Sequence, residues 1–145
     1  MPLNFQLVQN KQDYAWCTYI RTSVFIIEQN CPPELEIDEH EESCRHMLAR
    51  DGDVACATAR WRVYKPGIAK IERVAVLKPW RGKGVGLELL KAIIADIKTT
   101  SPECHTLRLG AQDYAIPFYE RLGFQVVEDG FIEANIPHHW MEKAA

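Results

Sequence analysis

The sequence lacks the features of several large protein classes. It contains no apolar run near the ~20 residues of a membrane-spanning helix. Its five cysteines are odd in number and form no CxxC pair, which favours reduced thiols over a disulfide framework. No basic region followed by an apolar run opens the chain, as a signal peptide would require. We therefore expect a cytoplasmic protein that does not act in a membrane.

The chain also lacks an excess of positive charge. The net charge is −3 at pH 7, which disfavours non-specific binding of nucleic acid. The chain has 145 residues, of which 47% are hydrophobic, and this is enough for one compact domain over residues 1–145. A domain of this size buries roughly 68–70% of its unfolded surface, so it can fold without disulfides or a metal.

Local patterns of apolar, glycine and proline residues predict alternating strands and helices. The expected strands cover residues 5–8, 45–50, 54–64, 69–77, 106–109, 124–127 and 131–136. The expected helices cover residues 11–28, 84–98 and 116–122, and the one at 84–98 has the clearest apolar face. This order predicts a mixed sheet covered by helices, an α/β or α+β fold.

A glycine-rich segment, Arg81-Gly82-Lys83-Gly84-Val85-Gly86, separates the strand at 69–77 from that helix. Glycines let backbone N–H groups converge on one point, and a helix N-terminus adds unpaired donors and a partial positive charge. Two cations stand beside them. The segment therefore predicts a phosphate site, although a glycine-rich turn that only caps the helix is the alternative.

The spacing excludes two common phosphate loops. No G-x-x-x-x-G-K-[ST] run is present. A dinucleotide fingerprint fails in both registers, because its sixth place is Leu87 when read from Gly82 and Leu89 when read from Gly84. The pattern that fits is Arg-x-x-Gly-x-Gly.

With that pattern the chain resembles the GNAT superfamily of N-acetyltransferases. Arg81, Gly84 and Gly86 match the Gln/Arg-x-x-Gly-x-Gly/Ala motif of the superfamily, and residues 115–124 match its A-x-x-F-Y-x-x-x-G-F segment. The segments 24–29 and 136–138 are also similar to a subgroup of small bacterial acetyltransferases. The resemblance implies a mixed, mostly antiparallel sheet flanked by about four helices.

The resemblance also implies acetyl-CoA as co-substrate, no metal, and transfer of an acetyl group to a primary amine of a small molecule or peptide. By this resemblance the residues expected to bind coenzyme A are Val74, Ala75, Val76, Arg81, Gly82, Lys83, Gly84, Val85, Gly86, Gln112 and Phe118. Gln112 departs from the Asn that many members carry and is one methylene longer. Direct attack in a ternary complex is the expected route, and the alternative is a non-catalytic acyl-CoA-binding or sensing domain.

Three side chains are candidates for proton transfer. Tyr119 matches the general acid of the superfamily, since a phenol is protonated at pH 7 and can protonate a departing thiolate; alternatively it only packs beside its aromatic neighbours. Glu72 and His138 are candidate bases for the amine, because histidine titrates near neutral pH and a carboxylate can act through water. Glu72 could instead pair with a nearby cation, and His138 could be an ordinary loop residue.

Other features allow weaker expectations. The acidic residues between Glu34 and Glu42 suggest a solvated loop, or a surface that attracts a cationic amine. An acyl-cysteine route through Cys104 and His105 is disfavoured, because both are remote in sequence from the two motifs. The spacing of Cys44, His46, His138 and His139 fits no zinc pattern. Apolar edges on the final strands suggest a homodimer.

Overall fold

The computed structural model describes residues 2–145; Met1, at which the expected domain begins, lies outside them. One eight-stranded mixed sheet runs through the described part in the order β1-β2-β3-β4-β5-β8-β6, and β7 pairs with β8. The strands are β1 (Leu3–Leu7), β2 (Arg45–Asp51), β3 (Val54–Lys65), β4 (Ile68–Val76), β5 (Thr106–Gln112), β6 (Gln125–Val126), β7 (Phe131–Glu133) and β8 (Ile136–Ala144).

Three α-helices cover this sheet. They are α1 (Lys11–Arg21), α2 (Val85–Thr100) and α3 (Ile116–Arg121). α1 continues without a break as the π-helix η1 (Thr22–Glu28). The expected helix over 11–28 is therefore confirmed, as one continuous helix whose first part is α-helical and whose second part is π-helical. Asn10 caps its start by accepting a hydrogen bond from the backbone N–H of Asp13 at 2.8 Å. A π-helix is rare and often marks a functional site.

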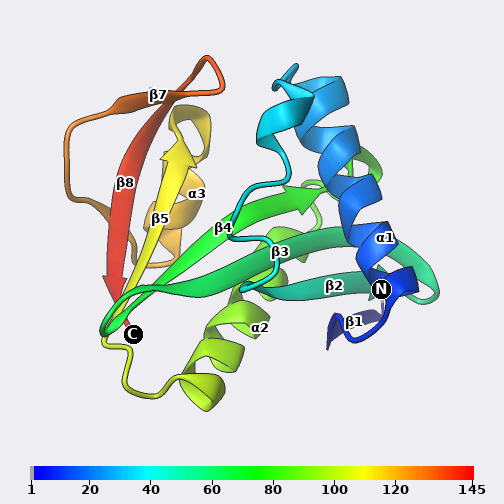
Figure 1. Cartoon of the computed structure of the whole chain (residues 1–145), viewed down its shortest axis with the longest axis horizontal. Coiled ribbons are helices and arrows are strands. Elements are labelled where there is room, and N and C mark those ends of the chain that lie inside the picture. Colours follow the sequence, from blue (N-terminus) through cyan, green and yellow to red (C-terminus); the bar gives the residue numbers. More distant parts are fainter. Residues whose placement is uncertain (1) are drawn as a thin grey trace.

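Alternation along the strands divides the core between the two faces of the sheet. Met47 and Ala49 of β2 pack in the larger cluster with α2 and α3, whereas Leu48 between them packs in a second cluster with α1. Figure 1 shows α1 and α2 on opposite sides of the strands. The expected layout of a mixed sheet covered by helices is confirmed.

The only parallel pairing in the described sheet joins β4 to β5, and it is short. It covers Ile68 to Lys70 against Thr106 to Arg108. Beyond these residues the two strands diverge, as Figure 1 shows, and β5 continues beside β8 while β4 continues beside β3. The sheet is therefore split into two arms that open away from the paired end.

The C-terminal part differs from the sequence prediction. A strand over 131–136 is wrong, because the chain turns back at Ala134 and Asn135, whose φ angles are 50° and 64°. Two positive φ angles in a two-residue connection are typical of a type I′ hairpin turn. The nine-residue β8 that follows was not predicted, and it lies inside the sheet between β5 and β6.

Within residues 2–145, no helix is both long and apolar enough to span a membrane.

Candidate functional site

The glycine loop connects β4 to α2. The short helix η3 (Lys78–Trp80) leads into it, and α2 begins at Val85. Gly82 and Gly84 have φ angles of 74° and 82°, a left-handed conformation that other residues rarely adopt. The first N–H groups of an α-helix have no acceptor within the helix, so those of α2 are directed out of its end into the loop. This geometry can receive an anion.

Arg81 is held from two sides. Its Nε donates a hydrogen bond of 2.9 Å to the carbonyl oxygen of Val76 at the end of β4. Its Nη2 lies 2.7 Å from a carboxylate oxygen of Glu28, the last residue of η1. The guanidinium therefore connects the loop, the open end of β4 and the π-helix.

β4 carries a bulge at the entrance to its open end. Between Thr58 and Arg60 the register against β3 shifts, so that two residues of β4 oppose one residue of β3. Arg73 in the bulge has a φ of 54°, which is uncommon for a residue with a side chain. After the bulge, Ala75 and Val76 pair with β3 on one side only, because β5 has already diverged. Backbone groups on the other side of β4 are available to a ligand.

A cavity of about 1020 Å³ is lined by both arms of the sheet, by the glycine loop and by α3. Of the sequence-predicted site residues, Lys83 alone does not line it. The others that do are Glu72, Val74, Ala75, Val76, Arg81, Gly82, Gly84, Val85, Gly86, Gln112, Phe118, Tyr119 and His138. Gly86 has a packing role, because a Cβ there would lie 3.3 Å from the ring of Phe118.

Tyr119 lies on α3 and lines the cavity. Its ring makes edge-on contacts with Phe118 and Phe124, at centroid distances of 5.0 and 6.0 Å. Burial raises the pKa of the phenol above its ordinary value. Tyr119 is therefore held as a protonated donor that reaches the cavity.

Glu72 lies on β4 among three cations. Its carboxylate is 2.8 Å from Lys70, 3.0 Å from Arg60 and 3.3 Å from Arg62. Burial alone would raise its pKa, but the hydrogen bond from Lys70 and the charges of the three cations outweigh burial, and the pKa is lowered. A carboxylate held in this way accepts a proton poorly, so the geometry favours an ion-pairing role over a role as base.

His138 lies on β8, where it is buried and lines the cavity. Its Nδ1 is 2.6 Å from the carbonyl oxygen of Ile136. A carbonyl only accepts, so Nδ1 carries the hydrogen and the neutral ring has its free electron pair on Nε2. His138 can therefore accept a proton at Nε2.

Gln112 ends β5 and donates a hydrogen bond of 2.8 Å from Nε2 to the side-chain oxygen of Gln29. Gln29 directly follows Glu28, which pairs with Arg81. The end of the π-helix thus contacts both the glycine loop and the opposite arm of the sheet. The longer side chain of Gln112 is used within the protein, across the opening of the cavity.

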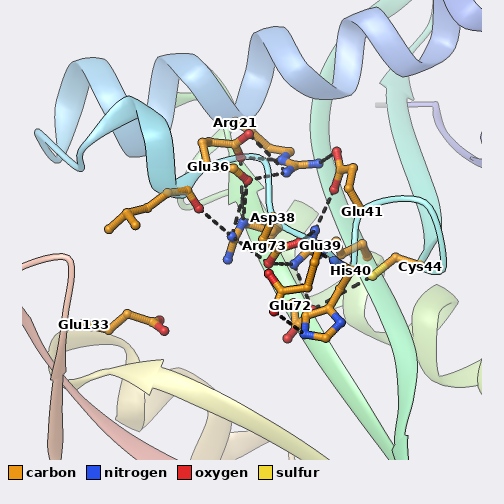
Figure 2. Close-up of polar contacts among 12 residues, drawn as sticks. Arg21, Glu36, Asp38, Glu39, His40, Glu41, Cys44, Glu72, Arg73 and Glu133 are labelled. Carbon is orange, nitrogen blue, oxygen red and sulfur yellow. Dashed lines mark hydrogen bonds and ion pairs between the residues drawn. The ribbon is translucent and has the colours of Figure 1, made fainter.

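The acidic segment does not form the solvated loop that the sequence suggests. Glu36 and Glu41 are buried, and both pair with the fully buried Arg21, at 2.6 and 2.7 Å. Figure 2 shows their carboxylates turned inward onto the guanidinium. The remaining oxygen of Glu41 lies 2.6 Å from the equally buried Arg60.

Asp38 completes this network. It lies 2.7 Å from Arg60 and 3.3 Å from Arg73. Burial alone raises its pKa, but the hydrogen bond from Arg60 and the charges of both arginines outweigh burial and lower the pKa to about 2. Because the arginines neutralise these carboxylates, the segment attracts a cationic amine less than its sequence suggests.

The sequence of the chain is similar to those of known proteins. Residues 13–145 match the family described as "Acetyltransferase (GNAT) domain". The uncharacterised N-acetyltransferase YjcF of Bacillus subtilis (strain 168) is 38% identical over 138 residues, which cover 94% of this chain and 96% of YjcF. The chain belongs to the GNAT family of acetyltransferases. Acyl transfer is therefore its general chemistry.

Solved structures of GNAT proteins agree with this assignment. An acyl-CoA N-acyltransferase from Pseudomonas aeruginosa superposes with a TM-score of 0.86 and 25% identity, covering 99% of this chain and all of the other. Escherichia coli ElaA superposes with a TM-score of 0.87 and 27% identity, covering 98% and 99% of the two chains. The GNAT fold predicted from the two motifs is confirmed.

Several residues near the cavity were not singled out by sequence reasoning, among them Glu28, Gln29, Phe131 and Glu133. The first two lie in the segment that resembles the bacterial subgroup, so that resemblance was the available signal. The other two were assigned only to an ordinary last strand. Their position over the cavity depends on the hairpin turn and on β8, neither of which the local pattern predicted.

Proposed function

We propose that this GNAT protein transfers an acetyl group from acetyl-CoA to a primary amine by direct attack in a ternary complex. The observation that carries the proposal is the single cavity that connects the glycine loop, the open end of β4, Tyr119 and His138. A phosphate site at one end and two proton-transfer groups deeper inside match the two ends of an acyl-CoA.

The chemistry of the residues that line the cavity supports coenzyme A as the ligand. The loop from Arg81 to Gly86 would bind the pyrophosphate through its N–H groups and its cations. Apart from the glycine and its chain neighbours, no heavy atom of residues 2–145 lies within 4 Å of the position that a Cβ would take at Gly82 or Gly84, so the backbone there is open to a close ligand. The free side of β4 at residues 74–76 would pair with the amide groups of the pantetheine arm, beside Phe118 and Gln112.

The bound thioester supplies the acetyl group, and the protein supplies three functions around it. A backbone N–H near Val74 donates to the carbonyl oxygen as it becomes negative; one such donor is typically worth about 3–4 kcal/mol in rate. The Tyr119 hydroxyl donates its proton to the departing sulfur. Both groups are in place before the reaction, because the bulge and the core fix them.

Deprotonation of the amine is assigned to His138 in preference to Glu72. An ammonium with an ordinary pKa of ~10.4 must lose a proton before it can attack. Nε2 of His138 is the available acceptor, since Nδ1 is engaged by Ile136. Glu72 is instead held by three cations.

We also propose a cytoplasmic location for the protein, in keeping with the odd number of cysteines.

The decisive experiment measures release of free thiol from acetyl-CoA in the presence of a broad panel of amines, together with thermal stabilisation by acetyl-CoA. Amine-dependent release and stabilisation are expected. Stabilisation without release from any amine would favour the non-catalytic acyl-CoA-binding domain. Stabilisation by ATP or NAD but none by acetyl-CoA would contradict both functions.

A further inference from the structure

Phe131 forms an aromatic wall in the part of the cavity remote from the glycine loop. Its ring stacks on His138 at a centroid distance of 5.2 Å and on Trp140 at 4.6 Å, with interplanar angles of 21° and 24°. All three line the cavity. Gly110 lies beneath them, because a Cβ there would be 3.1 Å from Phe131 and 3.3 Å from Trp140. The wall therefore lies directly beside the proposed base.

The cationic side chains near the aromatic wall already form ion pairs or hydrogen bonds within the protein. Lys70 and Arg62 pair with Glu72, and Arg73 bonds the carbonyl oxygens of Leu35 and Glu36. A carboxylate or phosphate on the acceptor would therefore have to displace an existing partner. This part of the cavity therefore disfavours amino acids and phosphorylated amines.

Glu133 differs from the buried carboxylates of the cavity. It lies at the hairpin turn of β7, its side chain is 65% exposed, and its carboxylate lies 4.0 Å from Nε2 of His138. Figure 2 shows it across the cavity from the arginine network that neutralises Glu36 and Asp38. Its charge is available to a ligand at the place where an amine would meet His138.

The surroundings of Trp140 restrict the charge of the remaining part of the acceptor. Lys70 lies 5.0 Å and Arg108 4.4 Å from its ring, so two cations already occupy the cation–π positions. A further ammonium group on the acceptor would be repelled there. The faces of Trp140 are taken by Phe131 and by these cations, so a neutral flat group would pack against the partly buried ring of Phe131.

We propose that the acceptor is a primary amine with one ammonium group and a flat apolar body, such as an arylalkylamine. Glu133 binds the ammonium beside His138, and Phe131 binds the ring. This inference rests on the proposed function, because it names the acceptor class of the same cavity.

The first test compares four amines with acetyl-CoA in the thiol-release assay: 2-phenylethylamine, hexylamine, phenylalanine and spermidine. We expect kcat/KM for 2-phenylethylamine to exceed that for each of the others by about tenfold or more. A higher value for spermidine or phenylalanine overturns the acceptor class and leaves the transferase activity standing. No release with any amine overturns the proposed function itself.

Two variants test the assigned residues. Glu133→Gln keeps the size of the side chain and removes its charge, so KM for 2-phenylethylamine should rise about tenfold while KM for acetyl-CoA is unchanged. Phe131→Leu keeps an apolar side chain and removes the ring, so KM should rise for 2-phenylethylamine and stay constant for hexylamine. Glu103→Gln, at an exposed carboxylate outside the cavity lining, is the matched control.

The outcomes separate a binding role from a structural one. A loss of kcat for all amines without a change in amine KM would assign Glu133 to the fold or to His138 and overturn its role in binding. Equal effects of Phe131→Leu on the aromatic and the aliphatic amine would overturn the stacking role.

Discussion

Arg81 of the glycine loop and Glu28 of the π-helix form an ion pair with 2.7 Å between Nη2 and the carboxylate oxygen. Both side chains are partly exposed, at 42% and 33%, so solvent screens the pair and it contributes little to stability. Its position matters more than its strength. A pyrophosphate that binds the loop would compete with Glu28 for the same guanidinium.

The first prediction follows from this competition. Arg81→Ala removes a cation from the phosphate site and should weaken acetyl-CoA binding by about tenfold. Glu28→Gln removes the competing carboxylate and should tighten binding a few-fold, because a like charge next to the phosphates is lost. Isothermal titration calorimetry at low and high salt measures both, and the effects should shrink as salt rises. Weaker binding by Glu28→Gln would show instead that Glu28 positions Arg81.

Tyr119 gives a second prediction. Tyr119→Phe keeps the ring that packs beside Phe118 and Phe124 and removes only the hydroxyl. The maximal rate should fall by about 10²-fold or more, because the departing thiolate loses its proton donor, while the Kd for acetyl-CoA stays nearly constant. Steady-state rates and calorimetry of the same protein preparation separate the two effects. An unchanged rate would remove Tyr119 as the acid.

His138 and Glu72 give a third prediction, in which the two candidate bases should respond differently. His138→Gln should lower kcat by about 10²-fold, because the amine loses its proton acceptor. Glu72→Gln should instead lower the free energy of unfolding by about 2–3 kcal/mol, since the buried Arg60 loses a partner. Steady-state rates and urea unfolding measure these effects. A large loss of kcat in Glu72→Gln with an unchanged rate in His138→Gln would reverse the assignment.

The sequence predicted the glycine loop and the order of most elements because these depend on local patterns. Gly84 has to adopt a positive φ before α2, and this requirement is visible in the residue type. The apolar face of α2 is likewise visible in its spacing. The cavity could be anticipated only through the family resemblance, because the divergence of β4 from β5 has no local signal.

β8 was missed because polar residues interrupt its apolar pattern. Glu142 and Lys143 read as surface residues, yet Glu142 pairs with Arg108 at 2.7 Å and Lys143 bonds the carbonyl oxygen of Leu122 at 2.7 Å. The arginine network was missed for a similar reason. Arg21 and Arg60 are charged residues at buried positions, and only the chain fold shows that Glu36, Asp38 and Glu41 reach them.

The fourth prediction concerns stability at acidic pH. The pKa of Asp38 is lowered from an ordinary 3.8 to about 2, mainly by Arg60 against the opposing effect of burial. A lowered pKa means that the folded state binds the proton less readily than the unfolded state. The stabilisation is therefore complete above about pH 4, falls as the pH drops, and is lost below about pH 2; in full it corresponds to about 2 kcal/mol.

Asp38→Asn isolates this contribution. At pH 7 the variant should have a free energy of unfolding about 2 kcal/mol below that of the parent, and the difference should shrink between pH 4 and pH 2. Urea unfolding at pH 7, 4 and 2.5 measures the difference directly. Glu34→Gln, in the same segment but exposed, should show no such pH dependence relative to the parent. A constant difference for Asp38→Asn across this range would contradict the ion pairing of Asp38, because a deleted charge pair must lose its effect once the parent carboxylate is protonated.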